Sequence, residues 1–172
     1  MTEFEWPWQY QFPPFFTLQP NTETRQKQVS AWRSLILSYC RHHGVYALDV
    51  AQCAQSPLFS NVAIKRRLSE ETIQTVLDDL ATLGHAEWTD KAKRRCLVLW
   101  RSPAEWGQLI YGWAVDSGLV GSVCTLYELT HGDHLTDQPF HGLCEELLVR
   151  ALGSLQAAGK AELMDNEGVK FF

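Results

Sequence analysis

The sequence of 172 residues lacks any apolar run that approaches 18 residues, which is roughly the length that a helix needs to cross a bilayer. Its acidic, proline-bearing start has no aliphatic core segment, so no secretory signal is visible. The cysteines are scattered and odd in number, and none forms a C-x-x-C pair. This usage favours a reduced setting over a disulfide framework. We therefore expect a cytoplasmic chain that does not insert directly into a membrane.

Catalytic motifs are also missing, because the sequence has no phosphate-cradling glycine loop, nucleophile elbow or H-E-x-x-H. One polar loop holds residue types that could bind zinc, namely His131, His134, His141 and Cys144. A chance cluster is the favoured interpretation, because Cys144 lies where a helix should begin. Cys40 lies close to His42 and His43, but nothing marks an activated nucleophile. The sequence thus predicts no catalytic residues, no metal and no other cofactor.

Charge divides the chain into two parts. Residues 1–102 carry 12 basic and 10 acidic side chains, a net charge of +2. Residues 103–172 carry 3 basic and 10 acidic side chains, a net charge of −7. The second part should therefore attract a basic partner rather than a phosphate backbone.

The chain contains an internal repeat. Residues 69–90 match residues 144–165 at a shift of 75, and residues 32–44 match residues 106–118 at a shift of 74. Such a long period indicates a duplicated domain rather than a solenoid.

Each copy has the same order of expected elements. A first helix with apolar residues at helical spacing ends at a glycine, Gly44 or Gly118, and the second of these helices begins with a capping box at Ser102–Glu105. A short segment that could be strand or helix follows, then a later helix and a terminal hairpin. This order predicts an α+β protein with two tandem winged-helix domains. We expect an extended arm over 1–20, a first domain over 21–101 and a second over 102–172.

The arm begins MTEFEWPWQYQFPPFF, with aromatic residues at every second position from Phe4 to Phe12. In an extended backbone this spacing gives one aromatic and one polar face, and the prolines disfavour a regular helix. A stripe of that size must pack on its own chain or on a partner. We expect the alternating rings to pack partly on the first domain and the PPFF segment to face outward. The candidate partner-binding residues are Trp6, Trp8, Tyr10, Phe12, Pro13, Pro14, Phe15 and Phe16.

Winged helices often bind DNA, so nucleic-acid binding is the alternative hypothesis. The helix that would enter the major groove is acidic in the first copy, with Glu70 and Glu71 in its first turn. Sequence-specific DNA-binding proteins usually have arginine or amide side chains on this helix. Basic residues gather instead at 65–67 and 91–95, which we interpret as solvated turns. The sequence therefore argues against a nucleic-acid partner.

The tip, the SPLFSN segment, the W-G-x-L-I-Y helix, TLYEL and the terminal GVKFF resemble the small, two-copy vacuolar protein sorting subunit of the ESCRT-II endosomal complex. The resemblance covers essentially the whole chain. It implies a non-enzymatic subunit with tandem winged-helix domains that helps to sort ubiquitinated cargo into multivesicular bodies.

The resemblance also implies partners. The proline–aromatic tip, here Pro13 to Phe16, would dock on two different core subunits, with one copy of the chain on each. The second domain would capture the basic first helix of an ESCRT-III subunit. The chain would then associate peripherally with endosomal membranes through the complex, with ubiquitin and lipid binding left to other subunits.

Overall fold

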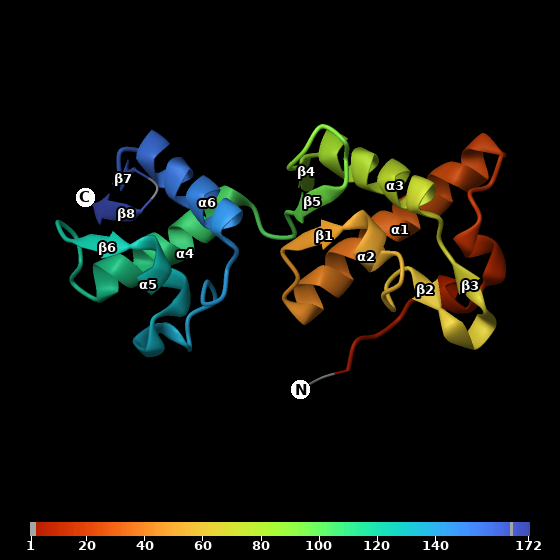
Figure 1. The fold of residues 1–172 in the computed structure, drawn as a ribbon, viewed down its shortest axis with the longest axis horizontal. Helices are drawn as coiled ribbons and strands as arrows, with labels where there is room; N and C mark the ends of the chain where they lie inside the picture. Colours follow the sequence, from red (N-terminus) through yellow and green to blue (C-terminus); the bar gives the residue numbers. More distant parts are fainter. Residues whose placement is uncertain (1–2, 166) are drawn as a thin grey trace. The chain divides into compact units, whose positions relative to one another are not determined.

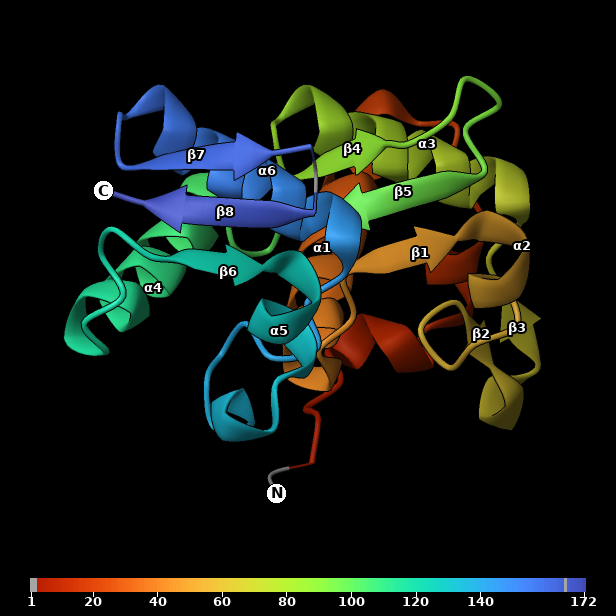
Figure 2. The ribbon, with the colours of Figure 1, turned by 60° about the vertical axis from the view of Figure 1, so that its left-hand side comes forward.

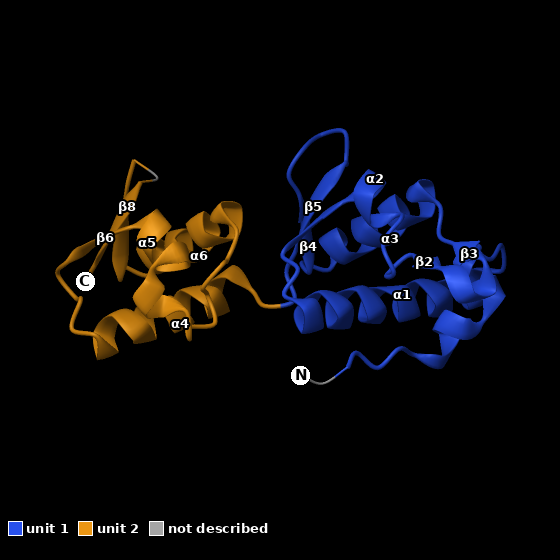
Figure 3. Ribbon diagram, turned by 60° about the horizontal axis from the view of Figure 1, so that its bottom comes forward, with its two compact units in different colours: residues 1–100 blue, residues 101–172 orange. Residues whose placement is uncertain are grey.

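The computed structural model describes residues 3–165 and 167–172. Its contacts divide the chain into two compact units, Met1–Trp100 and Arg101–Phe172 (Figure 3). Each unit combines helices with small antiparallel sheets, so the predicted α+β class is confirmed. In each unit a terminal hairpin follows the helices, which is the winged-helix arrangement.

Unit 1 is built on a long helix, α1 (Thr22–His43). The elements that follow in its winged-helix core are β1 (Ala47–Asp49), α2 (Val50–Cys53), α3 (Glu70–Thr82), β4 (Ala86–Trp88) and β5 (Arg95–Val98). Strand β5 lies between β1 and β4 and is antiparallel to both. The sequence did not decide whether the segment after α1 is a strand or a helix. It contains one of each, β1 and then α2.

A second, very small sheet interrupts unit 1 between α2 and α3 (Figure 1). It pairs β2 (Ser60–Asn61) with β3 (Arg66–Arg67), and a short 3₁₀ turn, η3 (Val62–Ile64), lies between them. We did not expect this hairpin, because two residues per strand are too few to show an alternating pattern.

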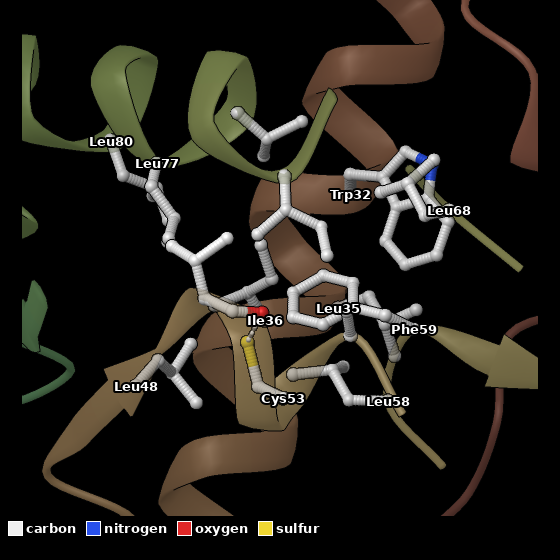
Figure 4. Close-up of a cluster of buried hydrophobic side chains, with 14 of the residues drawn as sticks. Trp32, Leu35, Ile36, Leu48, Cys53, Leu58, Phe59, Leu68, Leu77 and Leu80 are labelled. Atoms are coloured by element: carbon white, nitrogen blue, oxygen red, sulfur yellow. Dashed lines mark hydrogen bonds between the residues drawn. The ribbon is translucent and has the colours of Figure 1, made fainter. Parts of the chain in front are cut away.

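The core of unit 1 lies where α1 and α3 face each other. Helix α1 contributes Trp32, Leu35 and Ile36, and α3 contributes Leu77 and Leu80, all of them buried. Figure 4 shows these side chains meeting those of the segments between the two helices, including Leu48, Leu58, Phe59 and Leu68. The expected helical periodicity of both helices therefore matches the faces that they bury.

The helix ends follow the expected local signals. The capping box is formed, because Glu105 N donates to Ser102 Oγ at 3.1 Å and Ser102 N donates to Glu105 Oε1 at 3.3 Å. Gly44 closes α1 with a φ of 66°, a left-handed conformation that glycine adopts without strain.

Unit 2 repeats the arrangement with α4 (Pro103–Asp116), β6 (Val123–Thr125), α5 (Leu126–His131), η4 (Asp133–Leu135), α6 (Glu145–Ala157), β7 (Ala161–Met164) and β8 (Gly168–Phe171). Strand β8 lies between β6 and β7 (Figure 2). Helices α4 and α6 approach closely at Gly107, where an added Cβ would lie 2.8 Å from the Ala151 carbonyl oxygen. A glycine is therefore required at this helix contact.

Within residues 3–165 and 167–172, no helix has both the length and the apolar character that crossing a membrane requires.

Candidate functional site: a surface on the amino-terminal arm

The arm is less extended than its alternating pattern predicts. Two short 3₁₀ turns, η1 (Trp8–Gln11) and η2 (Pro13–Phe16), interrupt it. Proline disfavours the interior of a helix but suits its first position, because its fixed φ is already helical and its missing N–H would be unpaired there. Pro13 begins η2 in this way. The turns break the strict two-residue alternation, so neighbouring rings of the arm point in different directions.

The prediction that the PPFF segment faces outward is wrong for its two phenylalanines. Phe15 and Phe16 are each only 4% exposed. Phe15 stacks flat on the indole of Trp32 in α1, with ring centroids 4.2 Å apart and planes 1° apart. Phe16 meets the same indole edge-on at 5.4 Å. Both rings therefore belong to the core of unit 1.

A buried amide holds the arm in this position. Gln28 of α1 donates from Nε2 to the carbonyl oxygens of Phe15 and Thr17, both at 2.9 Å, and its Oε1 accepts from Gln19 N at 3.0 Å. The Trp32 indole N–H also donates to the Phe15 carbonyl, at 2.9 Å. These bonds satisfy main-chain groups of the arm that a buried position would otherwise leave unpaired.

Tyr10 anchors the arm on its other side. Its hydroxyl donates to the Pro57 carbonyl, and its own carbonyl accepts from Asn61 Nδ2 at 2.7 Å. Trp6 stacks on the Tyr10 ring at 3.9 Å. Burial, and in smaller part nearby Tyr39, raises the pKa of the Tyr10 phenol above its ordinary value. Tyr10 is thus a neutral structural residue, not an exposed contact.

Two rings of the arm remain at the surface. Trp8 is 70% exposed and Phe12 is 47% exposed, with ring centroids 5.6 Å apart. Together with the exposed Pro14 they border a hollow of about 510 Å³ between the arm and α1. The other residues lining it are Gln9, Phe15, Gln19, Thr24, Lys27, Gln28 and Ala31. We call this surface the arm groove.

The structure therefore divides the predicted partner-binding residues into three groups. Trp8, Phe12 and Pro14 lie at the arm groove, Trp6 and Pro13 are half-buried, and the remaining rings are interior: Tyr10, Phe15 and Phe16. Sequence reasoning missed the helical side of the groove. Its four residues on α1 occupy positions i, i+3, i+4 and i+7, which lie on one helix face, and they are Thr24, Lys27, Gln28 and Ala31.

Unit 2 has a groove of its own, which we call the α5 groove. Its volume is about 320 Å³. Its lining combines the apolar Leu126, Leu143 and Leu148 with the acidic Glu145 and Glu167.

An aromatic side chain stands at the α5 groove. Tyr127 is 73% exposed and stacks on His131, with ring centroids 4.4 Å apart. The His131 ring is also in contact with Thr130, whose Oγ1 lies 2.8 Å from His131 Nδ1. The first histidine of the possible zinc set is therefore engaged with its own helix.

The metal and nucleophile hypotheses find no support in the geometry. Across the part of the chain that the structure describes, no group of three or more His, Cys, Asp or Glu could hold a metal ion. Burial raises the pKa of Cys40, Cys53 and Cys96 to about 12 in each case. Thiols with such values are protonated at neutral pH and are poor nucleophiles.

The acidic helix α3 also weakens the nucleic-acid hypothesis. Its carboxylates form ion pairs with nearby basic residues, Asp78 with Lys93 at 2.8 Å and Asp79 with Arg33. Lys93 lies in the hairpin turn that would contact a nucleic-acid backbone, so part of its charge is already compensated.

The fold is that of a tandem winged-helix protein, and its candidate sites are the two surface grooves, one in each unit. Comparison with known proteins gives the family. A family profile described as "ESCRT-II complex subunit" matches residues 9–144. The chain therefore belongs to the ESCRT-II subunit family, and the resemblance inferred from its sequence is confirmed.

Individual relatives agree over the full length. The chain is 57% identical to vacuolar protein-sorting-associated protein 25 of Danio rerio, with 98% of this chain and 99% of the relative covered. The protein of the same name from Homo sapiens is 55% identical, with 98% of each chain covered. That from Drosophila melanogaster is 43% identical over the whole of both chains.

Solved structures match as well. The crystal structure of subunit VPS25 of the endosomal trafficking complex ESCRT-II gives a TM-score of 0.85 at 30% identity, covering 95% of this chain and 97% of that one. A crystal structure of the complex VPS22/VPS25/VPS36 contains a chain that gives 0.82 at 31% identity, covering 96% and 98%.

Proposed function

We propose that the chain is a non-enzymatic ESCRT-II subunit that docks on two different core subunits through its arm, one copy on each. Its second unit captures the basic first helix of an ESCRT-III subunit, and the complex sorts ubiquitinated cargo into multivesicular bodies. The chain acts in the cytoplasm and reaches the endosomal membrane as part of the complex. One of the similar solved structures contains VPS25 together with VPS22 and VPS36, which supports partners of this kind.

The observation that carries the docking proposal is the exposure of Trp8 and Phe12 beside the arm groove. A tryptophan that is 70% exposed leaves a large apolar area in water, although neighbouring rings of the same arm are buried. Aromatic anchors of this kind supply much of the binding energy at protein interfaces. Since Gln28 and Tyr10 hold the arm in place, the rings are presented with little ordering left to do on binding.

The α5 groove supports the helix-capture proposal. A basic amphipathic helix needs an apolar floor for one face and carboxylates for its cations. Leu126, Leu143 and Leu148 supply apolar lining, and Glu145 and Glu167 supply negative charge. The exposed ring of Tyr127 adds an aromatic contact at the edge.

A pair of surface variants tests both proposals at once. We expect Trp8→Ser with Phe12→Ser to abolish co-purification of the core subunits while leaving binding of a basic ESCRT-III helix peptide unchanged. Tyr127→Ser with Glu145→Lys should do the reverse. All four side chains are at least partly exposed, so both variants should fold.

The docking proposal would be refuted if native mass spectrometry showed that the Trp8/Phe12 variant still assembles stoichiometrically with the core subunits. Unchanged peptide affinity in the Tyr127/Glu145 variant would refute the location of the helix site. The mass of the wild-type complex also tests the expected two copies of the chain.

A further inference from the structure

The β2–β3 hairpin of unit 1 carries an apolar side chain at its turn. Val62, the first residue of η3, is 83% exposed, and Ala63 beside it is exposed too. In Figures 1 and 2 the hairpin lies at a corner of unit 1, beside η2 of the arm. A valine this exposed buries little apolar area within the unit.

Three cations follow the apolar turn directly. Lys65, Arg66 and Arg67 are all exposed. The Arg66 guanidinium donates to the Lys65 carbonyl at 3.2 Å. Among residues 3–165 and 167–172, none of the salt bridges to a carboxylate involves these three side chains. Their charge is therefore available to an anionic partner.

The base of the hairpin is fixed, so the turn has a defined position. Asn61 donates to the Tyr10 carbonyl at 2.7 Å and accepts from Ala63 N at 3.2 Å. Leu68, directly after β3, is buried, and its N–H donates to the Phe59 carbonyl at 2.8 Å. Lys65 holds a φ of 55°, the left-handed conformation that turns the chain back into β3.

A protruding apolar turn flanked by cations matches the chemistry of a bilayer interface. The apolar side chain can enter the boundary between headgroups and acyl chains, while lysine and arginine meet anionic headgroups. We propose that the β2–β3 hairpin contacts an anionic lipid surface, with Val62 inserted and Lys65, Arg66 and Arg67 on the headgroups. This departs from the expectation that the chain reaches the membrane only through other subunits.

A nucleic acid fits the same surface less well. A winged-helix domain that binds duplex DNA brings α3 toward the phosphates, and α3 begins with Glu70 and Glu71. A lipid surface requires contact with the hairpin alone. Phosphate recognition also gives no role to Val62, which is the most exposed large apolar side chain among the described residues.

The hairpin is separate from the arm groove. None of Val62, Lys65, Arg66 or Arg67 lines that groove. Substitutions at these four positions therefore leave the lining of the arm groove unchanged, and lipid binding can be measured on the chain without core subunits.

The test uses the full chain and co-flotation with phosphatidylcholine vesicles, with and without phosphatidylserine. We expect binding only when phosphatidylserine is present, and weaker binding as salt is raised. Arg66→Glu with Arg67→Glu should weaken binding by at least about 25-fold, because each of the two cations near an anionic surface contributes roughly fivefold. Val62→Ser should weaken binding without changing its salt dependence, and Val62→Trp should strengthen it.

The hairpin turn between β4 and β5 offers a control with the same change of charge. Lys91 and Arg94 are exposed there, so Lys91→Glu with Arg94→Glu alters net charge equally without touching the β2–β3 hairpin. An equal loss of binding in this control would overturn the proposal, as would no flotation with phosphatidylserine or no response to Val62→Ser. Tighter binding to duplex DNA than to vesicles, lost in the Arg66/Arg67 variant, would assign the surface to nucleic acid instead.

Discussion

The two units place a buried tryptophan at equivalent positions of the repeat but cover it in different ways. Trp32 in unit 1 and Trp106 in unit 2 are each 1% exposed. The ring of Trp32 is covered by Phe15 of the arm, whereas the ring of Trp106 has the Arg101 guanidinium over it at 4.6 Å. In unit 1 the covering group is thus a separate segment with surface rings of its own.

The first helices differ in the same region. Helix α4 begins at Pro103, which the 74-residue shift aligns with Val29, whereas α1 begins at Thr22. Those additional turns of α1 carry Gln28 and part of the arm groove. The arm and the start of α1 therefore form one addition to a winged-helix unit, and the arm groove lies within this addition, whereas the α5 groove of unit 2 lies on the winged-helix elements themselves.

The largest expected change in stability comes from removing the Phe15 ring that covers Trp32. Phe15→Ala should lower the free energy of unfolding of unit 1 by about 3–5 kcal/mol, because it removes a buried ring and leaves a cavity. In unit 2, Arg101→Ala should lower it by only about 1 kcal/mol, the size of a partly exposed cation–π contact. Hydrogen exchange resolved by residue measures the two units separately.

A ring from the same arm serves as the control for Phe15. Phe12 is 47% exposed, and Phe12→Ala should change the free energy of unfolding by no more than about 0.5 kcal/mol. Equal destabilisation by the two substitutions would mean that burial of Phe15 stabilises unit 1 no more than the surface position of Phe12 does.

The next effect concerns how closely the helices approach in each unit. Gly107→Ala should destabilise unit 2 by about 1–3 kcal/mol, because the new methyl group would lie 2.8 Å from the Ala151 carbonyl oxygen. Gly112 on the same helix has nothing within 4 Å of an added Cβ, so Gly112→Ala should stabilise it by about 0.5–1 kcal/mol. Chemical denaturation of the two variants gives the comparison. In unit 1 the position equivalent to Gly107 is Arg33, which is paired with Asp79.

A smaller effect should follow from the amide that holds the arm. Gln28→Leu leaves the Gln19 N–H without its acceptor and removes one of two donors from each of the Phe15 and Thr17 carbonyls, at a cost of about 1–2 kcal/mol. We expect faster amide exchange and proteolysis in the arm, with unit 2 unchanged. Wild-type protection of the arm in this variant would show that the Gln28 amide is not needed to hold it.

Local signals in the sequence were enough for the capping box at Ser102 and the two terminal hairpins, because each depends on residues close together in the chain. The repeat could be predicted because segments 75 residues apart match directly in sequence. The exposure of individual arm rings could not be predicted in the same way. Whether Phe15 or Phe12 is buried depends on Trp32 and Gln28, which lie beyond the arm in sequence and contact it only in the folded unit. The β2–β3 hairpin escaped prediction because each of its strands has only two residues, a single period of the strand pattern, so no alternation can repeat.

The smallest expected effect concerns the hydrogen bonds between the terminal hairpin and the preceding helix, which differ between the two units. In unit 1, Asp78 accepts from the Trp88 indole at 2.8 Å and pairs with Lys93, while in unit 2 the uncharged Gln156 accepts from Leu163 N at 2.8 Å. Burial alone would raise the pKa of Asp78, but the hydrogen bonds from Lys93 and Trp88 outweigh it and hold that pKa below its ordinary value of 3.8.

A carboxyl group whose pKa is depressed by folding stabilises the folded state above its ordinary pKa, and this stabilisation is lost as pH falls through the folded value. Asp78→Asn should therefore reduce the stability of unit 1 at neutral pH by less than about 1 kcal/mol, since the pair is partly exposed. The difference from wild type should vanish in acid below pH 3.8 and shrink in high salt, with no matching change in unit 2. Unfolding followed against pH by residue-resolved hydrogen exchange checks this, and a difference that persists undiminished in acid would assign the effect of the substitution to packing rather than to charge.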